Sequence, residues 1–199
     1  MSSERRTYSL EVAVQPPSVA NPGTPFYPPL VARVHIYDSN GVEITGEDEL
    51  SGLFAQATLY RESGSPPPLA PPDMYLLSGR LSASLDLLNE PGVPPVSGSS
   101  WSEQKGSYVM FPDLIINRAG RYRLGVSLFK VEGGAPLRSP SSAINGGAGG
   151  GTTLEEAKTN VIIVQEGGAR AEQIDLATEE LLEHLRSRGA IVPSPPSRC

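Results

Sequence analysis

The chain has 199 residues, of which 38% are hydrophobic, and its formal net charge is −6. This length suits one sandwich or barrel domain, or at most two small domains, and the acidic balance is the reverse of the basic footprint of a non-specific nucleic-acid binder. Because Cys199 is the one cysteine, the sequence excludes a disulfide within the chain and a metal site built on cysteines.

Proline and glycine predict where the order of the chain is interrupted. The 20 prolines and 21 glycines make up about a fifth of the residues, which lies between an average globular chain and a low-complexity one. We expect a flexible N-terminus over 1–7 and one domain over 8–193. Disordered insertions are expected in this domain near 63–73, 89–106 and 133–156, and a disordered tail over 194–199.

The N-terminal segment and the apolar runs give no sign of membrane targeting. The first residues, MSSERRTYSLEVAV, contain no long apolar stretch, so we expect no signal peptide. No apolar run approaches the eighteen or so residues that a membrane helix needs. We expect a soluble intracellular protein with no membrane partner.

Seven segments have the alternation or composition of short strands. Four alternate regularly with the period of a half-buried strand, and they are Tyr8–Val14, Leu30–Tyr37, Leu53–Tyr60 and Arg121–Val131. Three less regular segments are Tyr75 to about Ala83, Ser107–Ile116 and Lys158–Gln165. The proline-rich segment between the first two strands, Ser18–Pro29, is predicted to be a loop.

One helix is predicted near the end of the chain, from Leu176 to about Arg188. Asp175 is placed to cap its first turn, and Gly189 follows its last turn. A helix of this length is marginal alone, so we expect its leucine stripe to pack on the chain's own sheet. That stripe consists of Leu181, Leu182 and Leu185.

Short strands without helices between them predict an all-β antiparallel sandwich with long loops and one C-terminal helix. In immunoglobulin-type sandwiches a tyrosine near the start of strand F lies two residues before an inward core position, and its hydroxyl ties down the corner. Here Gly120, Tyr122 and Leu124 stand in that order. The sequence therefore favours an immunoglobulin-like sandwich.

The stretch GSYVMFPDLIINRAGRYRLGVSLFKV, residues 106–131, resembles the core of the velvet domain of fungal regulatory proteins. That family has an aromatic-rich strand with a Phe-x-Asp-Leu corner, then a Gly-Arg-Tyr-Arg-Leu strand that ends in Leu-Phe. The matching residues are Phe111, Asp113, Leu114, Gly120, Arg121, Tyr122, Arg123, Leu124, Leu128 and Phe129.

Weaker similarities extend this resemblance from Tyr8 to about Pro193. They are the Gln-Pro motif at Gln15 and the Pro-Pro pair before the second strand. The others are the Leu-x-Gly segment at Leu77 and Gly79, and the closing segment TEELLEHLRSRGAIVP.

The resemblance implies a Rel-type immunoglobulin-like sandwich and a dimer with another velvet protein, either a homodimer or a heterodimer. It implies a transcriptional regulator that couples fungal development and sporulation to secondary metabolism, with DNA binding that depends on the partner. It also implies localisation in the nucleus and cytoplasm, and no catalytic activity, cofactor or small-molecule substrate. The alternative is an immunoglobulin-like protein-interaction module without nucleic-acid binding.

Candidate residues for duplex DNA follow from a departure from the family pattern. DNA-binding members carry Arg and Lys in the loop after the first strand, where they neutralise phosphates, whereas residues 16–29 here contain neither. The nearest candidates are Arg5, Arg6, Gln15 and Arg33.

Candidate residues for a protein partner are one aromatic side chain and a group of arginines. Trp101 is an aromatic anchor in a polar loop, which suits an interface; alternatively it folds back on the sandwich. Arg118, Arg121 and Arg123 form either a basic patch for an acidic partner or the solvated face of a strand.

Motifs for catalysis or metal binding are missing from the sequence. It contains no phosphate loop, no G-x-S-x-G and no H-E-x-x-H. His35 and His184, the only histidines, are expected at the surface. We therefore expect no catalytic residue, no metal and no cofactor, and a protein that is not an enzyme.

Overall fold

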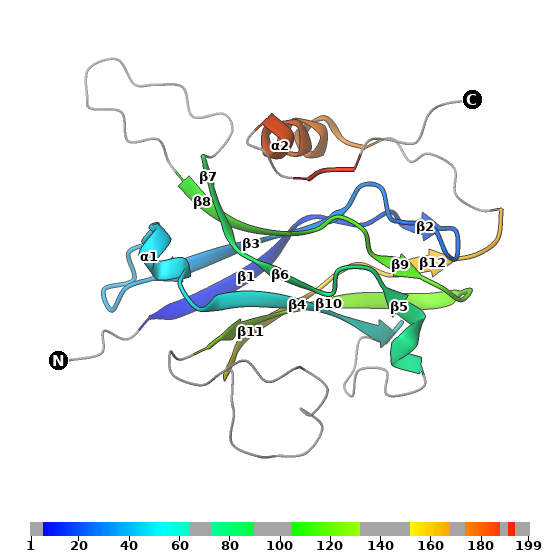
Figure 1. The fold of residues 1–199 in the computed structure, drawn as a ribbon, viewed down its shortest axis with the longest axis horizontal. Helices are drawn as coiled ribbons and strands as arrows, with labels where there is room; N and C mark the ends of the chain where they lie inside the picture. Colours follow the sequence, from blue (N-terminus) through cyan, green and yellow to red (C-terminus); the bar gives the residue numbers. More distant parts are fainter. Residues whose placement is uncertain are drawn as a thin grey trace.

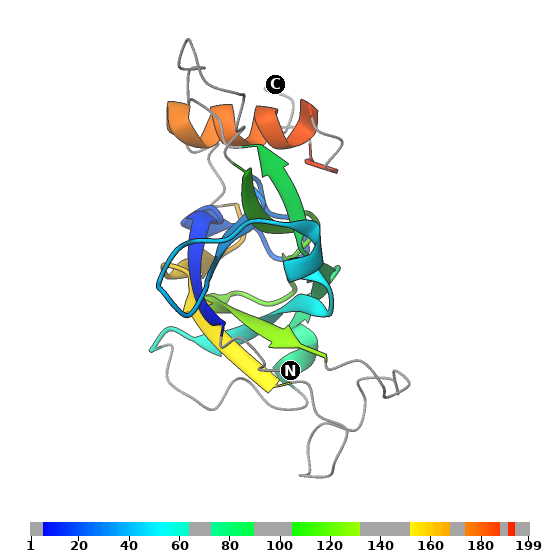
Figure 2. The same cartoon turned by 90° about the vertical axis from the view of Figure 1, so that its left-hand side faces the viewer.

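Two β-sheets face each other, and a helix lies over the outer face of one of them. The computed structural model describes residues 6–63, 73–89, 105–131, 152–167, 174–187 and 191–193. Viewed along its long axis in Figure 2, the molecule shows the helix above one sheet and the other sheet below. The all-β sandwich predicted from the sequence is confirmed.

Sheet A has four antiparallel strands: β1 (Thr7–Val14), β3 (Leu30–Tyr37), β8 (Lys105–Phe111) and β7 (Asp86–Asn89), in that order across the sheet. Sheet B has the order β2 (Val19–Ala20), β12 (Ile162–Val164), β10 (Gly120–Lys130), β4 (Leu53–Arg61) and β6 (Ser82–Ser84), and β11 (Thr152–Lys158) also pairs with β10. A third, small sheet joins β5 (Leu77–Ser78) to β9 (Ile115–Ile116). Figure 1 shows this arrangement.

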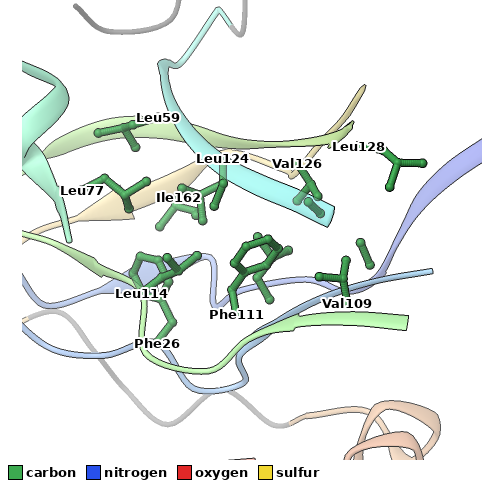
Figure 3. Close-up of a cluster of buried hydrophobic side chains, with 14 of the residues drawn as sticks. Phe26, Leu59, Leu77, Val109, Phe111, Leu114, Leu124, Val126, Leu128 and Ile162 are labelled. Atoms are coloured by element: carbon green, nitrogen blue, oxygen red, sulfur yellow. The ribbon is translucent and has the colours of Figure 1, made fainter. Parts of the chain in front are cut away.

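The inward residues of the two large sheets form the main core because strand side chains alternate between faces. Figure 3 shows leucine, valine and phenylalanine side chains from both sheets meeting between them. The least exposed include Ala32, Ala55, Val109, Phe111, Leu124, Val126 and Leu128. Four predicted strands, which correspond to β1, β3, β4 and β10, match the structure within a residue at each end.

The C-terminal helix α2 (Leu176–Ser187) packs on the outer face of sheet A, as expected. Its Leu182 and Leu185 are buried in a second apolar cluster, which also contains Val14, Val31, Tyr108 and Val192. Asp175 caps the helix, since its Oδ1 accepts a 2.7 Å hydrogen bond from the backbone N–H of Thr178. This bond lowers the pKa of the Asp175 carboxyl.

Several predictions need correction at this level. The expected strand from Tyr75 to about Ala83 is instead a 3-10 turn, η1 (Asp73–Leu76), followed by β5 and β6 in two different sheets. The expected strand Ser107–Ile116 is divided between β8 and β9. A second helix, α1 (Glu47–Leu50), was not predicted, and β12 pairs with β2 in parallel.

The segments predicted to be flexible or disordered reach less far than expected. Arg6 is ion-paired and Thr7 begins β1. Asp73 begins η1, Asn89 ends β7 and Lys105 begins β8, while β11 begins at Thr152, within the predicted insertion 133–156. Of these segments, residues 1–5, 64–72, 90–104, 133–151 and 194–199 lie outside the described residues.

The break between β5 and β6 has a backbone cause. Gly79 has a φ of +100°, and a Cβ built on it would lie 2.1 Å from the carbonyl oxygen of Asp113. The next residue, Arg80, donates its backbone N–H to Asp113 Oδ1 at 2.9 Å. Only glycine tolerates both the left-handed conformation and this close approach. The Leu-x-Gly segment and the Phe-x-Asp-Leu corner therefore contact each other directly.

We expect Gly79→Ala to lower the free energy of unfolding by more than about 3 kcal/mol, because a left-handed conformation and a backbone collision add together. Gly41→Ala is the matched control, since Gly41 has a φ of +78° but nothing within 4 Å of its built Cβ. It should cost only about 1–2 kcal/mol. Urea denaturation measures both variants, and equal losses would show that the contact with Asp113 is unimportant.

Candidate functional site

A buried tyrosine holds the corner at which β10 begins. Tyr122 is 5% exposed, and its hydroxyl donates a 3.4 Å hydrogen bond to the carbonyl of Ala119. A Cβ built on Gly120 would lie 2.8 Å from two ring carbons of Tyr122, so glycine is needed beneath the ring. The predicted tyrosine corner is therefore present, and it positions the arginines on both sides of it.

These arginines gather with Arg61 of β4 at one end of sheet B. We call Arg61, Glu62, Asp73, Arg118, Arg121 and Arg123 the arginine corner. Asp73 lies between two guanidinium groups, at 3.2 Å from Arg61 and 3.4 Å from Arg118. Glu62 accepts a 2.6 Å hydrogen bond from Arg121, which lowers the pKa of the Glu62 carboxyl and raises that of Arg121.

The guanidinium groups of the corner differ in exposure and role. The side chains of Arg61, Arg118 and Arg121 are 69%, 58% and 54% exposed, so a partner can reach them. Arg123 instead donates from Nε to the carbonyl of Glu62 at 2.9 Å and from Nη1 to the carbonyl of Thr159 at 2.8 Å. Arg123 thus joins β4 to the segment between β11 and β12.

Sequence reasoning did not find Arg61, Glu62 or Asp73 as members of this corner. Asp73 stands at the end of a proline-rich segment, and 45 residues separate it from Arg118. No local pattern indicates a contact over such a separation. The only signal was the density of arginines around Tyr122, which identified half of the group.

The residues predicted to bind nucleic acid do not form one surface. Arg6 precedes β1 and is held by Glu49 through hydrogen bonds of 3.1 and 2.9 Å, which lower the pKa of that carboxyl. Gln15 follows β1 at its other end, where its Oε1 accepts a 3.0 Å hydrogen bond from the N–H of Asn160. An eight-residue strand separates Arg6 from Gln15.

Arg33 lies on the outer face of sheet A, where its guanidinium is 3.9 Å from Glu43 and 6.0 Å from the ring centre of Tyr108. Near it, His35 lies between two carboxylates, 2.8 Å from Glu43 and 3.3 Å from Glu11. The side chain of His35 is only 16% exposed, so His35 is more buried than the surface position that was predicted for it. Arg5 and Trp101 lie outside the described residues, so their predicted roles remain predictions.

A second polar cluster, which no pattern in the sequence indicated, lies on the outer face of sheet B. The hydroxyl of Tyr60 donates to Glu156, and Lys158 Nζ lies 3.2 Å from Glu156 and 4.7 Å from the Tyr60 ring centre. Burial and the adjacent carboxylate raise the pKa of Tyr60 to about 12. The phenol is therefore neutral at ordinary pH and has no activated oxygen for nucleophilic chemistry.

Neither a metal-binding cluster nor a membrane-spanning helix occurs in the part of the chain that the structure describes. Among the described residues, no group of three or more His, Cys, Asp or Glu side chains could hold a metal ion. No helix in the described ranges is long and apolar enough to cross a membrane. In comparisons with known proteins, no protein-family model matches the sequence, and no curated protein matches it either.

We expect Arg123→Ala to lower the free energy of unfolding by about 1–3 kcal/mol, because two carbonyl groups lose a charged donor. Arg121→Ala removes only an exposed ion pair with Glu62, which solvent screens, and should lower the free energy of unfolding by less than Arg123→Ala does. Thermal or urea denaturation compares the two variants. A larger loss for Arg121→Ala would contradict the structural role assigned to Arg123.

We expect the Tyr60 phenol to make stability depend on pH at the alkaline end. Its pKa rises from 10.0 to about 12 on folding, so the folded state holds the proton more tightly. The contribution is complete below pH 10 and is lost as the pH rises from 10 to about 12. Tyr60→Phe should reduce this loss in urea unfolding curves, whereas Tyr75→Phe, which changes an exposed ring, should keep the wild-type slope.

Proposed function

We propose that this chain is a velvet-type transcriptional regulator that acts in the nucleus and cytoplasm as a dimer with another velvet protein. Its role is regulatory and not catalytic: it couples fungal development and sporulation to secondary metabolism. In this proposal the partner supplies most of the DNA contact. The protein has no cofactor and no small-molecule substrate.

The observation that carries the proposal is the contact between two motifs that underlie the resemblance. Gly79 of the Leu-x-Gly segment lies against the carbonyl of Asp113 in the Phe-x-Asp-Leu corner, and the two are far apart in the sequence. Tyr122 of the Gly-Arg-Tyr-Arg-Leu strand is buried at its corner. In proteins with a common fold, the motif residues serve the same backbone arrangement. These contacts therefore support the relationship to the velvet family.

The charges support a subunit that contributes little to DNA binding. Nucleic-acid affinity comes chiefly from cations that neutralise phosphates. Arg6 and Arg33 lie beside carboxylates, and the loop over 16–29 has no Arg or Lys. With a net charge of −6, the chain needs a more basic partner to approach duplex DNA.

A second candidate is an immunoglobulin-like protein-interaction module without nucleic-acid binding. The pairing of Arg61, Arg118 and Arg121 with Asp73 and Glu62 favours it, since these carboxylates compete with phosphate. The two candidates differ in whether DNA is ever bound.

A salt-titrated binding assay on duplex DNA, with and without a basic velvet-domain protein, tests the proposal. We expect no measurable binding by this chain alone at physiological salt. With the partner, we expect a complex on DNA whose affinity falls steeply with salt, because counterions are released. If the two proteins form no complex and DNA stays unbound in both cases, the interaction module is the better description.

A further inference from the structure

The arginine corner has the composition of a protein-binding surface. Tyr75 in η1, two residues after Asp73, is 73% exposed, which is unusual for a large aromatic side chain. The side chains of Arg61, Arg118 and Arg121 are each more than half exposed. Tyrosine and arginine are the residues most enriched at the energetic centres of protein interfaces.

The carboxylates of the corner hold its guanidinium groups in place before a partner arrives. Asp73 contacts both Arg61 and Arg118, and Glu62 contacts Arg121. Restricting long side chains in advance lowers the entropy cost of binding. Three guanidinium groups contact the two carboxylates, and the fourth, that of Arg123, contacts backbone carbonyls. With four arginines and two carboxylates, the corner keeps an excess of positive charge.

The complementary charge lies at the opposite end of the same molecule. Helix α1 joins the start of β4, whereas the arginine corner begins at its end, and Figure 1 shows the two at opposite ends of the sandwich. Nine residues of β4 separate them by about 30 Å. Glu47 and Asp48 of α1 are exposed and make no ion pair within the described residues, while Glu49 is held by Arg6.

This separation exceeds the Debye length of about 8 Å at physiological ionic strength, so the two ends cannot neutralise each other within one chain. If the arginine corners of two copies met each other, like charges would come together. This repulsion disfavours a two-fold contact through this surface. Duplex DNA is also disfavoured, because Asp73 and Glu62 compete with phosphate and an exposed tyrosine adds little on a duplex.

We propose that the arginine corner, together with the exposed Tyr75 of the adjoining η1, binds the acidic α1 end of a second copy of this chain. The contact is heterologous, because one end of a copy meets the opposite end of the next, so repeated contacts would link copies beyond the proposed dimer. This inference rests on the proposed function, because pairing between velvet-type chains is part of it. It adds the surface and the chemistry of one such contact.

Charge reversal on the full chain tests this contact. One variant carries Arg118→Glu and Arg121→Glu, and the other carries Glu47→Arg and Asp48→Arg. In sedimentation velocity at low ionic strength, we expect wild type to associate as its concentration rises and each variant alone to associate at least tenfold more weakly. An equimolar mixture of the two variants should regain association, because both of its contacts then pair opposite charges.

Two controls exclude general charge effects and misfolding. Glu179→Arg with Glu180→Arg makes the same charge change as Glu47→Arg with Asp48→Arg, but on the exposed face of α2. This control should leave association unchanged. Circular dichroism should show wild-type spectra for all variants, and raising the salt from about 0.01 M to about 1 M should dissociate wild type, since charges are then screened within about 3 Å.

Several results would overturn the inference. These are a wild-type chain that stays monomeric at low salt, association that survives Arg118→Glu and Arg121→Glu, or a variant mixture that stays monomeric. Loss of partner-assisted DNA binding in that arginine variant, with self-association intact, would make the corner a nucleic-acid surface instead. If the chain binds a velvet partner but does not self-associate, this contact is wrong and the proposed function is unaffected. If it self-associates but binds no velvet partner, the proposed function is wrong and this contact is unaffected.

Discussion

Strand β10 is the element on which both the core and the candidate surface depend. It pairs with β4 along one side and with β12 and then β11 along the other. Side chains alternate between the two faces along β10. Tyr122, Leu124 and Val126 therefore lie in the core, whereas Arg121 and Arg123 lie on the outer face. A slip of one residue would exchange the two faces. The buried ring of Tyr122 over Gly120 opposes such a slip, since a neighbouring residue could not fill the same space.

The irregular connections are held by backbone contacts as well as by buried side chains such as Phe26. The segment after β1 donates from Gly23 to the carbonyl of Ile116 at 3.0 Å and from Phe26 to that of Leu114 at 3.1 Å. Together with the contact between Gly79 and Asp113, these bonds close one end of the sandwich around β9. A proline-rich connection satisfies its polar backbone in this way without a regular strand.

The separation of charge along the molecule links the fold to the proposed role. An antiparallel strand places its two ends at opposite ends of the sandwich, so β4 carries the acidic α1 at one end and the arginine corner at the other. The carboxylates that hold the guanidinium groups also make them poor ligands for phosphate. A surface of this kind suits contact with an acidic protein.

By itself, the sequence determined the fold class, the four regular strands, the terminal helix with its Asp175 cap and the tyrosine corner. All of these follow from periodicity or from residues a few positions apart, which local sterics and side-chain alternation decide. Only the tertiary structure decided that the segment from Asp73 to Asn89 divides among three sheets. The same is true of the contacts that Asp73 makes with Arg61 and Arg118. These depend on which distant backbone atoms meet, as where Gly79 leaves room for the carbonyl of Asp113, and no local pattern records such a meeting.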